Sequence, residues 1–409
     1  MLKDYGALFA RNGHFILFGM LMMALSGPGQ TFFFSYFIAD IRADFNLSHS
    51  EFGALYSAAT LCSAFLILFT GPLIDNWRLT HYVGAVLLGV GVSSLVLGLA
   101  EGLPLLFLGF VLARHFGQGL CMHTTGTAFG RSFDRNRGRA VALGQIGLPV
   151  GETLLSIYIV WLLTGFHWQQ SLIVTGLGVL FVALPVQVWL ARNEPDARHD
   201  RSDKRPVISQ SRSEILRDWR FYAITVYYIG SPTLLTGLFL NQALLAQERD
   251  WPLAVIAYAF AFYAGMKICI SLIVGPQIDR FGARNILPLS AIPLVLALAC
   301  LLMFEGQTEL SDYPVLPFIY MGLVGANVGI NSASTSSLWP ELYGTQYLGA
   351  IRSLVSTITT FGTACSPVLA GVLLDLGFGY NGLVWASLFY TLGSLPIALA
   401  GLRKPASSQ

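Results

Sequence analysis

Charged residues are scarce in this chain of 409 residues, and their scarcity excludes an ordinary soluble domain. Asp, Glu, Lys and Arg make up 11% of the residues, whereas soluble domains carry about 25%. The formal net charge of +2 is too small to indicate a nucleic-acid partner. Hydrophobic residues make up 54% and the mean hydropathy is +0.62, so we expect the chain to lie in a lipid bilayer.

Cysteines and catalytic clusters are also sparse. The five cysteines all fall inside apolar runs and lack the spacing of a metal or redox site: Cys62, Cys121, Cys269, Cys300 and Cys365. We therefore expect reduced thiols, no metal and no cofactor. No pair of His, Asp or Cys has the spacing of a nucleophile and its base, so we expect no enzymatic activity. No cleavable signal is evident, because the first apolar run is longer than a signal core.

Apolar segments of spanning length are abundant, and we expect each of the twelve to form a transmembrane helix, because backbone polar groups must be satisfied within the lipid. They lie near residues 14–39, 50–73, 81–100, 103–128, 139–163, 168–191, 219–246, 252–275, 284–304, 314–338, 348–374 and 381–401. Gly27-Pro28-Gly29, Pro149 and Pro367 are interpreted as kinks within helices. The aromatic run Phe32–Phe37 would cover all sides of the first helix, so part of it is expected to face lipid.

A short turn occurs twice in the sequence. Gly71-Pro72-Leu73-Ile74-Asp75 returns as Gly275-Pro276-Gln277-Ile278-Asp279, at an offset of 204 residues. A repeat at half the chain length indicates two similar halves. Residues 192–217 are charged and poor in apolar side chains, as is typical of a solvated linker. We therefore predict an all-α membrane protein with twelve transmembrane helices in two pseudo-symmetric six-helix bundles, residues 1–191 and 218–409, joined by a cytoplasmic linker at 192–217.

The distribution of Lys and Arg predicts the orientation. If the N-terminus is cytoplasmic and the segments alternate, 20 of the 24 basic residues fall on the cytoplasmic side. Only Arg42 and Arg249 fall outside, and Arg114 and Lys267 lie within apolar segments. This asymmetry follows the positive-inside rule, and it predicts that both termini are cytoplasmic.

The duplicated turn resembles a motif of the major facilitator superfamily, whose loop between helices two and three reads roughly G-x-L-x-D-R-x-G-R-R. The first copy matches this pattern at Gly71, Leu73 and Asp75 and departs from it at Asn76, Arg78 and Leu79. The second copy keeps Gly275, Asp279, Arg280, Gly282 and Arg284 and departs at Gln277 and Ala283. Helix four carries Arg114, Gly117 and Gly119, which are similar to the R-x-x-x-G pattern that this family links to proton coupling.

The resemblance implies a secondary transporter of a bacterial inner membrane that works by alternating access. The segment Glu341–Arg352 resembles the loop before helix eleven in bacterial carriers of the monocarboxylate and oxalate–formate branch, which implies a small organic anion coupled to protons. We expect a monomer whose partners are its solute, protons and the bilayer. An exporter of amphipathic compounds, a carrier of a neutral solute and a nutrient sensor without transport remain alternatives.

Ionisable residues deep in a bilayer are costly and usually functional. Arg114 lies about ten residues into helix four and Glu152 about thirteen into helix five, so both are expected near the midplane. We predict that they form a pair that breaks and re-forms, because a buried carboxylate without its cation takes up a proton. Glu152 is then the proton carrier, and a static ion pair is the alternative. Lys267 of helix eight is predicted to neutralise an anionic substrate, and snorkelling to the interface is the alternative.

Several polar residues could line a central cavity together with Arg114 and Lys267, although each could instead make an interhelical hydrogen bond. They are Gln30, Tyr227, Asn241, Asn327 and Asn331. Asn327 aligns with Arg114 at an offset of 213 residues. His115 and His123 are expected to pack or to form hydrogen bonds. Asp75 and Asp279, with Arg280 and Arg284, are predicted to close the cytoplasmic gate.

Overall fold

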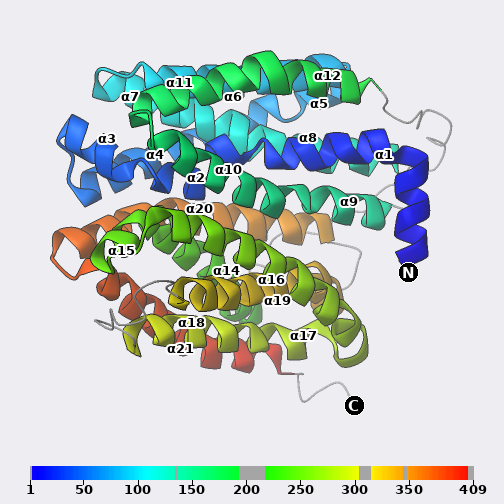
Figure 1. The fold of residues 1–409 in the computed structure, drawn as a ribbon. Helices are drawn as coiled ribbons and strands as arrows, with labels where there is room; N and C mark the ends of the chain where they lie inside the picture. The colour runs from blue at the N-terminus through cyan, green and yellow to red at the C-terminus, as the bar shows by residue number, and fades with distance from the viewer. Residues whose placement is uncertain (1, 134–136, 193–216, 304–314, 344–347, 404–409) are drawn as a thin grey trace. The chain divides into compact units, whose positions relative to one another are not determined.

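The computed structural model describes residues 2–133, 137–192, 217–303, 315–343 and 348–403, and residues 193–216 of the predicted linker lie outside them. Every regular element in the described residues is helical (Figure 1), and eleven segments are long and apolar enough to cross a bilayer. The remaining predicted span forms α19 (Leu316–Tyr343), a helix of 28 residues. The predicted all-α membrane fold with twelve transmembrane helices in two bundles is confirmed.

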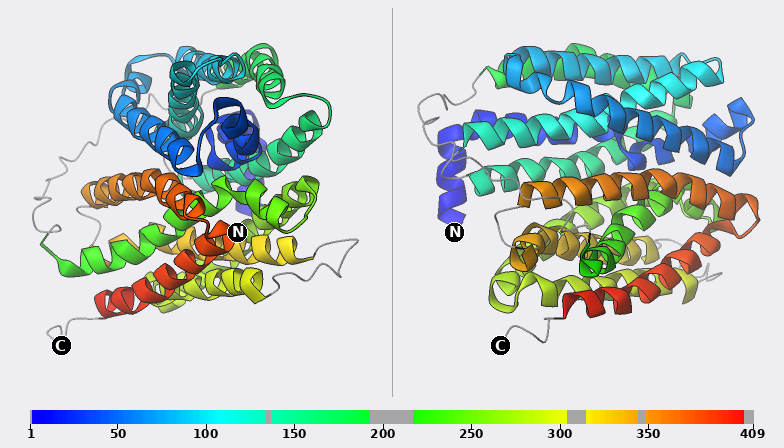
Figure 2. Two further views of the ribbon diagram at one scale, coloured as in Figure 1. Left: turned by 90° about the vertical axis from the view of Figure 1, so that its left-hand side faces the viewer. Right: turned by 180° about the vertical axis from the view of Figure 1, so that it is seen from behind.

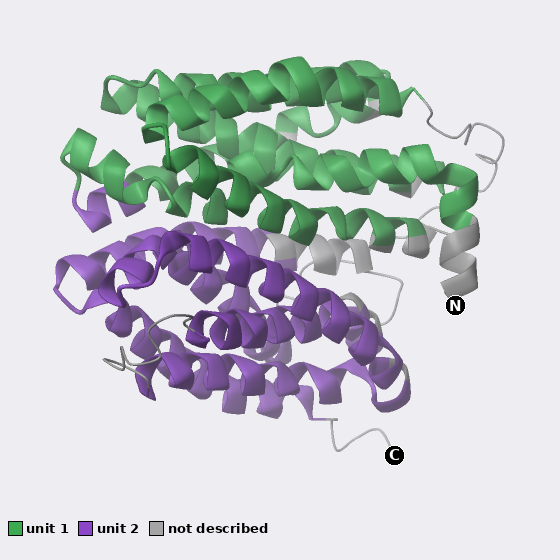
Figure 3. Cartoon of the chain, viewed as in Figure 1, with its two compact units in different colours: residues 1–47, 54–204 green, residues 48–53, 205–409 purple. Residues whose placement is uncertain are grey.

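The chain divides into two compact units (Figure 3). Unit 1 comprises residues 1–47 and 54–204, and unit 2 comprises residues 48–53 and 205–409. In each unit the long helices run alongside one another, as the views in Figures 1 and 2 show. The first turn of α4 (His49–Thr70) is counted with unit 2, and the later turns of this helix are counted with unit 1.

Unit 1 is built from six spans, several of them interrupted. Its remaining elements are α1 (Leu2–Ala24), η1 (Gly27–Gly29), α2 (Thr31–Ser35), α3 (Ile38–Phe45), α5 (Leu73–Asn76), α6 (Leu79–Gly98), α7 (Leu103–Leu112), η2 (Ala113–Cys121), α8 (Met122–Ser132), α9 (Arg137–Gln145), α10 (Gly147–Leu163), α11 (Trp168–Gly178), η3 (Val179–Ala183) and α12 (Leu184–Ala191). Here η1 is a 3₁₀ turn, whereas η2 and η3 are π-helical. Buried phenylalanines form much of its core: the Phe15 ring contacts those of Phe18, Phe129 and Phe133, and the last two rings contact each other.

The first span is broken, and this break corrects two expectations. Gly27-Pro28-Gly29 forms a separate 3₁₀ turn, after which Gln30 is extended, so the chain makes an interruption there and not a kink. The aromatic run is also not exposed: Phe32, Phe33, Phe34, Tyr36 and Phe37 are all buried. The expectation that part of this run faces lipid is therefore wrong, because α2 has only five residues and a turn follows it, so the side chains do not follow one continuous helical surface.

Unit 2 contains longer uninterrupted helices. Its elements are α14 (Trp219–Leu240), α15 (Gln242–Glu248), α16 (Leu253–Phe281), α17 (Ala283–Ile286), η5 (Leu287–Ser290), α18 (Ala291–Met303), α19, α20 (Leu348–Asp375) and α21 (Gly379–Leu402). Glycines hold α19 tightly against α16, since a Cβ on Gly325 would lie 3.2 Å from the Lys267 amide nitrogen and a Cβ on Gly329 would lie 2.8 Å from its carbonyl oxygen. Small residues that let two backbones approach in this way are typical of packed membrane helices.

The end of α20 holds the first turn of α4. The Asp375 carboxylate accepts hydrogen bonds from the backbone N–H groups of His49 at 2.9 Å and Ser50 at 2.7 Å. Gly371 lies directly against the His49 carbonyl, and Gly53 lies directly against the carbonyl of Pro367. Because the first N–H groups of a helix have no partner within it, Asp375 completes the hydrogen bonding of this helix start.

Candidate functional site

Arg114 lies at the centre of a buried polar cluster in unit 1. Its side chain is only 2% exposed. Nε donates to the Thr60 hydroxyl of α4 at 3.1 Å, and Nη1 donates to the Gly29 carbonyl of η1 at 3.0 Å. The guanidinium carbon also lies 5.1 Å from the centre of the Tyr56 ring. Within the described residues, these contacts of Arg114 are all with neutral groups, so the cluster orients the positive charge without cancelling it.

Two irregular backbone segments bring Arg114 to the Gly29 carbonyl. Arg114 lies in η2, where the π-helical geometry interrupts the span between α7 and α8. A Cβ on Gly117 would lie 2.7 Å from both Cα and N of Gly29. The 3₁₀ turn η1 can therefore lie directly against η2 only because Gly29 and Gly117 carry no side chains. A carbonyl exposed by the break in the first span then accepts from the guanidinium.

Gln30 and its neighbour Thr31 extend this cluster along the first span. Gln30 is half-buried, and its amide donates to the Ser26 hydroxyl at 3.2 Å and to the Met122 sulfur at 3.5 Å. The Tyr56 hydroxyl donates to Thr31 at 3.3 Å. Gln30 and Arg114, which were both predicted to bind substrate, thus lie in one region of unit 1, next to Gly29.

Glu152 borders the same interruption. It is half-buried on α10, and the preceding Gly151 packs on α1, since a Cβ there would lie 2.5 Å from the Ala24 Cα. Gly27 packs on Leu155 of the same helix. The described contacts of Arg114 do not include Glu152. The pairing of these two residues therefore stays a prediction. Both of their segments, η2 and α10, pack against the turn Gly27–Gly29 that interrupts the first span.

Lys267 lies on α16 in unit 2 and is half-buried. Its ammonium nitrogen lies 5.4 Å from the centre of the Tyr263 ring, one turn earlier on the same helix. The close packing of Gly325 and Gly329 on its backbone fixes the position of Lys267 against α19. An aromatic face stabilises a nearby ammonium group, so Tyr263 orients this cation.

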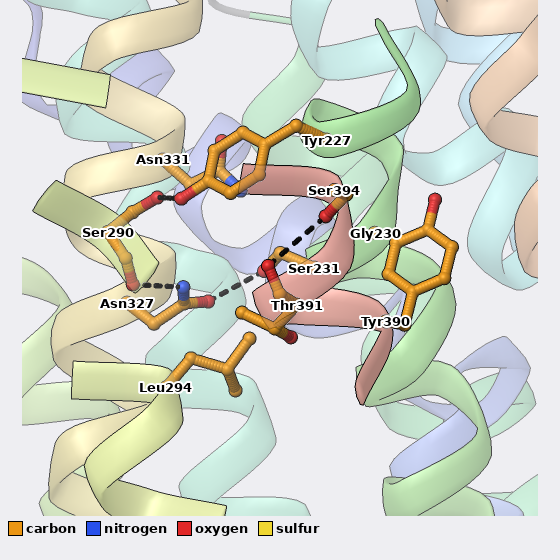
Figure 4. A pocket seen from close by; sticks show the side chains of 10 residues that line it. All are labelled: Tyr227, Gly230, Ser231, Ser290, Leu294, Asn327, Asn331, Tyr390, Thr391 and Ser394. Carbon is orange, nitrogen blue, oxygen red and sulfur yellow. Dashed lines mark hydrogen bonds between the residues drawn. The ribbon is translucent and has the colours of Figure 1, made fainter. Parts of the chain in front are cut away.

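A second polar cluster lies inside unit 2 and contains three of the predicted residues (Figure 4). Asn327 accepts from the Ser231 hydroxyl at 2.6 Å and donates to the Ser290 carbonyl at 2.8 Å. The Tyr227 hydroxyl lies 2.8 Å from that of Ser290. Asn331 lies one turn beyond Asn327 on the buried side of α19. The two halves thus repeat one arrangement: Arg114 joins its helix to η1 of the first span, and Asn327 joins α19 to α14.

Asn241 and the two histidines of helix four make local hydrogen bonds. Asn241 lies between α14 and α15, and its amide donates to the Gly237 carbonyl at 2.9 Å. His115 Nε2 lies 3.3 Å from the Thr70 hydroxyl, and His123 Nε2 lies 3.1 Å from the Gly71 carbonyl. Both histidines thus hold the end of α4 next to the duplicated turn.

Of the four predicted gating residues, the structure describes the side chains of Arg280 and Arg284. Arg284 pairs with Glu341, with 3.4 Å between Nε and Oε1, and Glu341 also accepts from the Ala283 amide at 2.5 Å. Arg280 is exposed, and its guanidinium carbon lies 5.0 Å from the centre of the Phe281 ring. The side chains of Asp75 and Asp279 lie outside the described residues. In unit 2 the second copy of the turn is therefore tied to the end of α19.

Sequence reasoning missed the neutral partners that shape both clusters. Tyr56 and Thr60 of α4 surround Arg114, and Ser231 and Ser290 surround Asn327. In the sequence these are ordinary polar residues in apolar helices. The one usable signal was their spacing: Tyr56 and Thr60 are four residues apart and so share a helix face.

The sequence profile of the Major Facilitator Superfamily matches residues 19–265 and again residues 233–408, so the chain belongs to this family. Among known proteins, it is 21% identical to Monocarboxylate transporter 2 of Mus musculus over 380 residues, which cover 86% of this chain and 76% of that protein. The matched family and this fold make the chain a multi-pass membrane transporter and not an enzyme.

Two solved structures share the fold at low sequence identity. A bacterial homolog of the human lysosomal transporter Spinster, inward-facing and unoccupied, matches with a TM-score of 0.70 and 15% identity over 96% of this chain and 97% of that one. The nucleoside transporter NupG matches with a TM-score of 0.71 and 15% identity over 95% and 98%. At this low sequence identity, the structural similarity establishes the shared fold.

Proposed function

We propose that this transporter carries a small organic anion, such as a monocarboxylate, across a bacterial inner membrane by alternating access and with proton coupling. Both termini are proposed to be cytoplasmic, as the distribution of Lys and Arg predicts. The substrate would lie near the midplane of the membrane, in contact with Arg114, Lys267 and Gln30. Tyr227, Asn327, Asn331 and Asn241 would support the helices that form the wall of this site.

The observation that carries the proposal is the buried guanidinium of Arg114. A buried cation is stable only when an anion or good hydrogen-bond acceptors compensate the loss of water. A guanidinium has five N–H donors, and the Thr60 hydroxyl and the Gly29 carbonyl take two of them. Within the described residues its partners are neutral, so the positive charge is available to a carboxylate that arrives as substrate. The planar donor array suits a carboxylate in particular.

Lys267 and Glu152 complete the proposed mechanism. Lys267 would bind the substrate from unit 2, where Tyr263 and the glycines of α19 hold it in place. Glu152 would take up the coupled proton when the positive charge of Arg114 is engaged by the substrate, because a carboxylate in a low-dielectric site is stable only when compensated or protonated. The similarity to Monocarboxylate transporter 2 supports a carboxylate as the cargo.

Uptake into proteoliposomes tests the proposal. Purified protein is offered a panel of small carboxylates, their neutral amides and nucleosides, with and without an inward proton gradient. We expect gradient-driven uptake of at least one carboxylate and no uptake of its amide. Uptake of neutral solutes alone would contradict the proposed anion specificity.

The matched variants Arg114→Lys and Arg114→Gln test the observation itself. Arg114→Gln keeps a polar side chain but removes the charge, so we expect carboxylate affinity to fall about 30-fold or more, which corresponds to about 2 kcal/mol. Arg114→Lys keeps the charge without the planar donor array and should lose less affinity. Unchanged carboxylate affinity in a folded Arg114→Gln protein would refute the role of Arg114.

A further inference from the structure

A small cavity lies inside unit 2, where side chains from α14, η5, α19 and α21 converge (Figure 4). Hydroxyl groups from three of these elements line it, together with the amide of Asn331: Tyr227, Ser290, Thr391 and Ser394. The space open to the centre of a water molecule is about 10 Å³, which is about the size of one such molecule. The cavity is therefore far too small for an organic solute, and its polar lining distinguishes it from a dry packing defect.

Asn331 has an unmet hydrogen bond at this cavity. The residue is only 6% exposed, and its Oδ1 atom is buried without a hydrogen-bond partner among the described residues. A buried amide oxygen without a partner loses its hydration and gains nothing in return. Such groups are rare in native proteins, and an unseen water is a common reason for them.

The hydroxyl groups around Asn331 cannot supply the missing hydrogen. Three hydroxyl groups of the lining donate to backbone carbonyls: Ser290 to Leu287 at 2.7 Å, Thr391 to Ser387 at 2.8 Å and Ser394 to Thr391 at 3.3 Å. Tyr227 pairs with Ser290 and also lies 3.4 Å from the Pro288 carbonyl. Each hydroxyl hydrogen is thus already directed at an acceptor, while lone pairs of the same oxygens stay available. The hydroxyl groups of the lining therefore offer free lone pairs but leave no hydrogen for Asn331 Oδ1.

We propose that this cavity binds one ordered water molecule, which donates to Asn331 Oδ1 and to a hydroxyl oxygen of Tyr227 or Ser394. Water is the smallest neutral molecule with two donors, and it fits both the volume and the donor deficit. A cation fits poorly, because none of the described residues that line the cavity is acidic. The assignment of oxygen and nitrogen in the Asn331 amide does not matter, since water can also accept from an N–H group.

The proposed water would link helices across the interior of unit 2. Asn331 lies on α19, Tyr227 on α14 and Ser394 on α21. Gly325 and Gly329 pack α19 against the backbone of Lys267, and Asn327 and Asn331 lie on the other side of the same helix. The water would therefore complete the hydrogen bonding behind the helix that positions Lys267.

High-resolution cryo-electron microscopy of the full chain in nanodiscs tests this site. We expect one density peak within hydrogen-bond distance of Asn331 and of a hydroxyl oxygen, in sodium-containing and sodium-free buffer alike. Asn331→Leu should abolish the peak. The matched variant Thr391→Val should keep it, because the Thr391 hydroxyl already bonds within its own helix. An empty cavity in the unaltered protein, a peak that persists in Asn331→Leu, or a peak that requires sodium would overturn the proposal.

A second measurement applies to the unaltered protein and does not depend on the folding of a variant. X-ray radiolysis modifies buried side chains rapidly when a bound water lies beside them. Tyr227 borders the cavity, whereas the fully buried Tyr380 bonds to the Leu238 carbonyl and does not line it. We expect Tyr227 to be modified several-fold faster than Tyr380. Equal rates for the two tyrosines would contradict a bound water.

Discussion

Gly117→Ala gives the sharpest test of the Arg114 cluster, because the added atom meets backbone and not a movable side chain. The new Cβ would lie 2.7 Å from Cα and N of Gly29, whereas carbon atoms in contact are about 3.5–4.0 Å apart. The turn η1 must therefore retreat by about 1 Å. Overpacking of this kind costs about 1–3 kcal/mol, and each kcal/mol lowers the Tm of a unit of this size by about 2–4 °C.

The same displacement should impair transport, because the Gly29 carbonyl that accepts from Arg114 moves with η1. We expect Gly117→Ala to lower the Tm by several degrees and to reduce carboxylate uptake. Thermal unfolding in detergent and uptake by proteoliposomes measure the two effects. Gly126→Ala is the matched control, since it lies on the following segment α8 and its Cβ would meet nothing within 4 Å. If the two variants are equally stable and equally active, the close approach of Gly29 and Gly117 has no role.

The remaining predictions concern three charged residues. Glu152→Gln should abolish uptake driven by a proton gradient while exchange of labelled substrate persists, and gradient-driven uptake at the normal rate would reject its role as proton carrier. Lys267→Ala should weaken binding of anions only, so an equal loss for neutral solutes would argue for a structural role. Asp375→Ala should destabilise the start of α4 by about 1 kcal/mol, with faster hydrogen exchange at the amides of His49 and Ser50, and unchanged exchange at both amides would show that the carboxylate is dispensable.

The sequence predicted the helices well because hydropathy and length determine which segments can cross a bilayer. The predicted span at 252–275, for example, lies within α16 except for Pro252, which directly precedes this helix, and the span at 168–191 is covered by α11, η3 and α12. The offset between the halves also relates Asn327 to Arg114 from the sequence alone. Each of these residues joins its helix to the first helix of its own half.

The interior of the bundles was harder to predict, because it depends on where backbones approach each other. The separate turn η1 can lie directly against the π-helical segment η2 because Gly29 and Gly117 carry no side chains at the point of contact. No local pattern in either segment shows that the other lies against it. The burial of the aromatic run after Gln30 follows from the same break. The prediction that part of this run faces lipid assumed one continuous first helix, and it was therefore wrong.

The wide turn of η2 also limits how the length of this gene can vary. A π-helical segment accommodates a residue that an α-helix would not hold, and about 100° of rotation separates successive residues. Loss of any one codon between Ala113 and Cys121 would let the segment relax to an ordinary α-helix and would remove the widened turn that holds Arg114 and Gly117 against η1. Homologues that keep the guanidinium cluster should therefore accept substitutions in this stretch more readily than single-residue deletions.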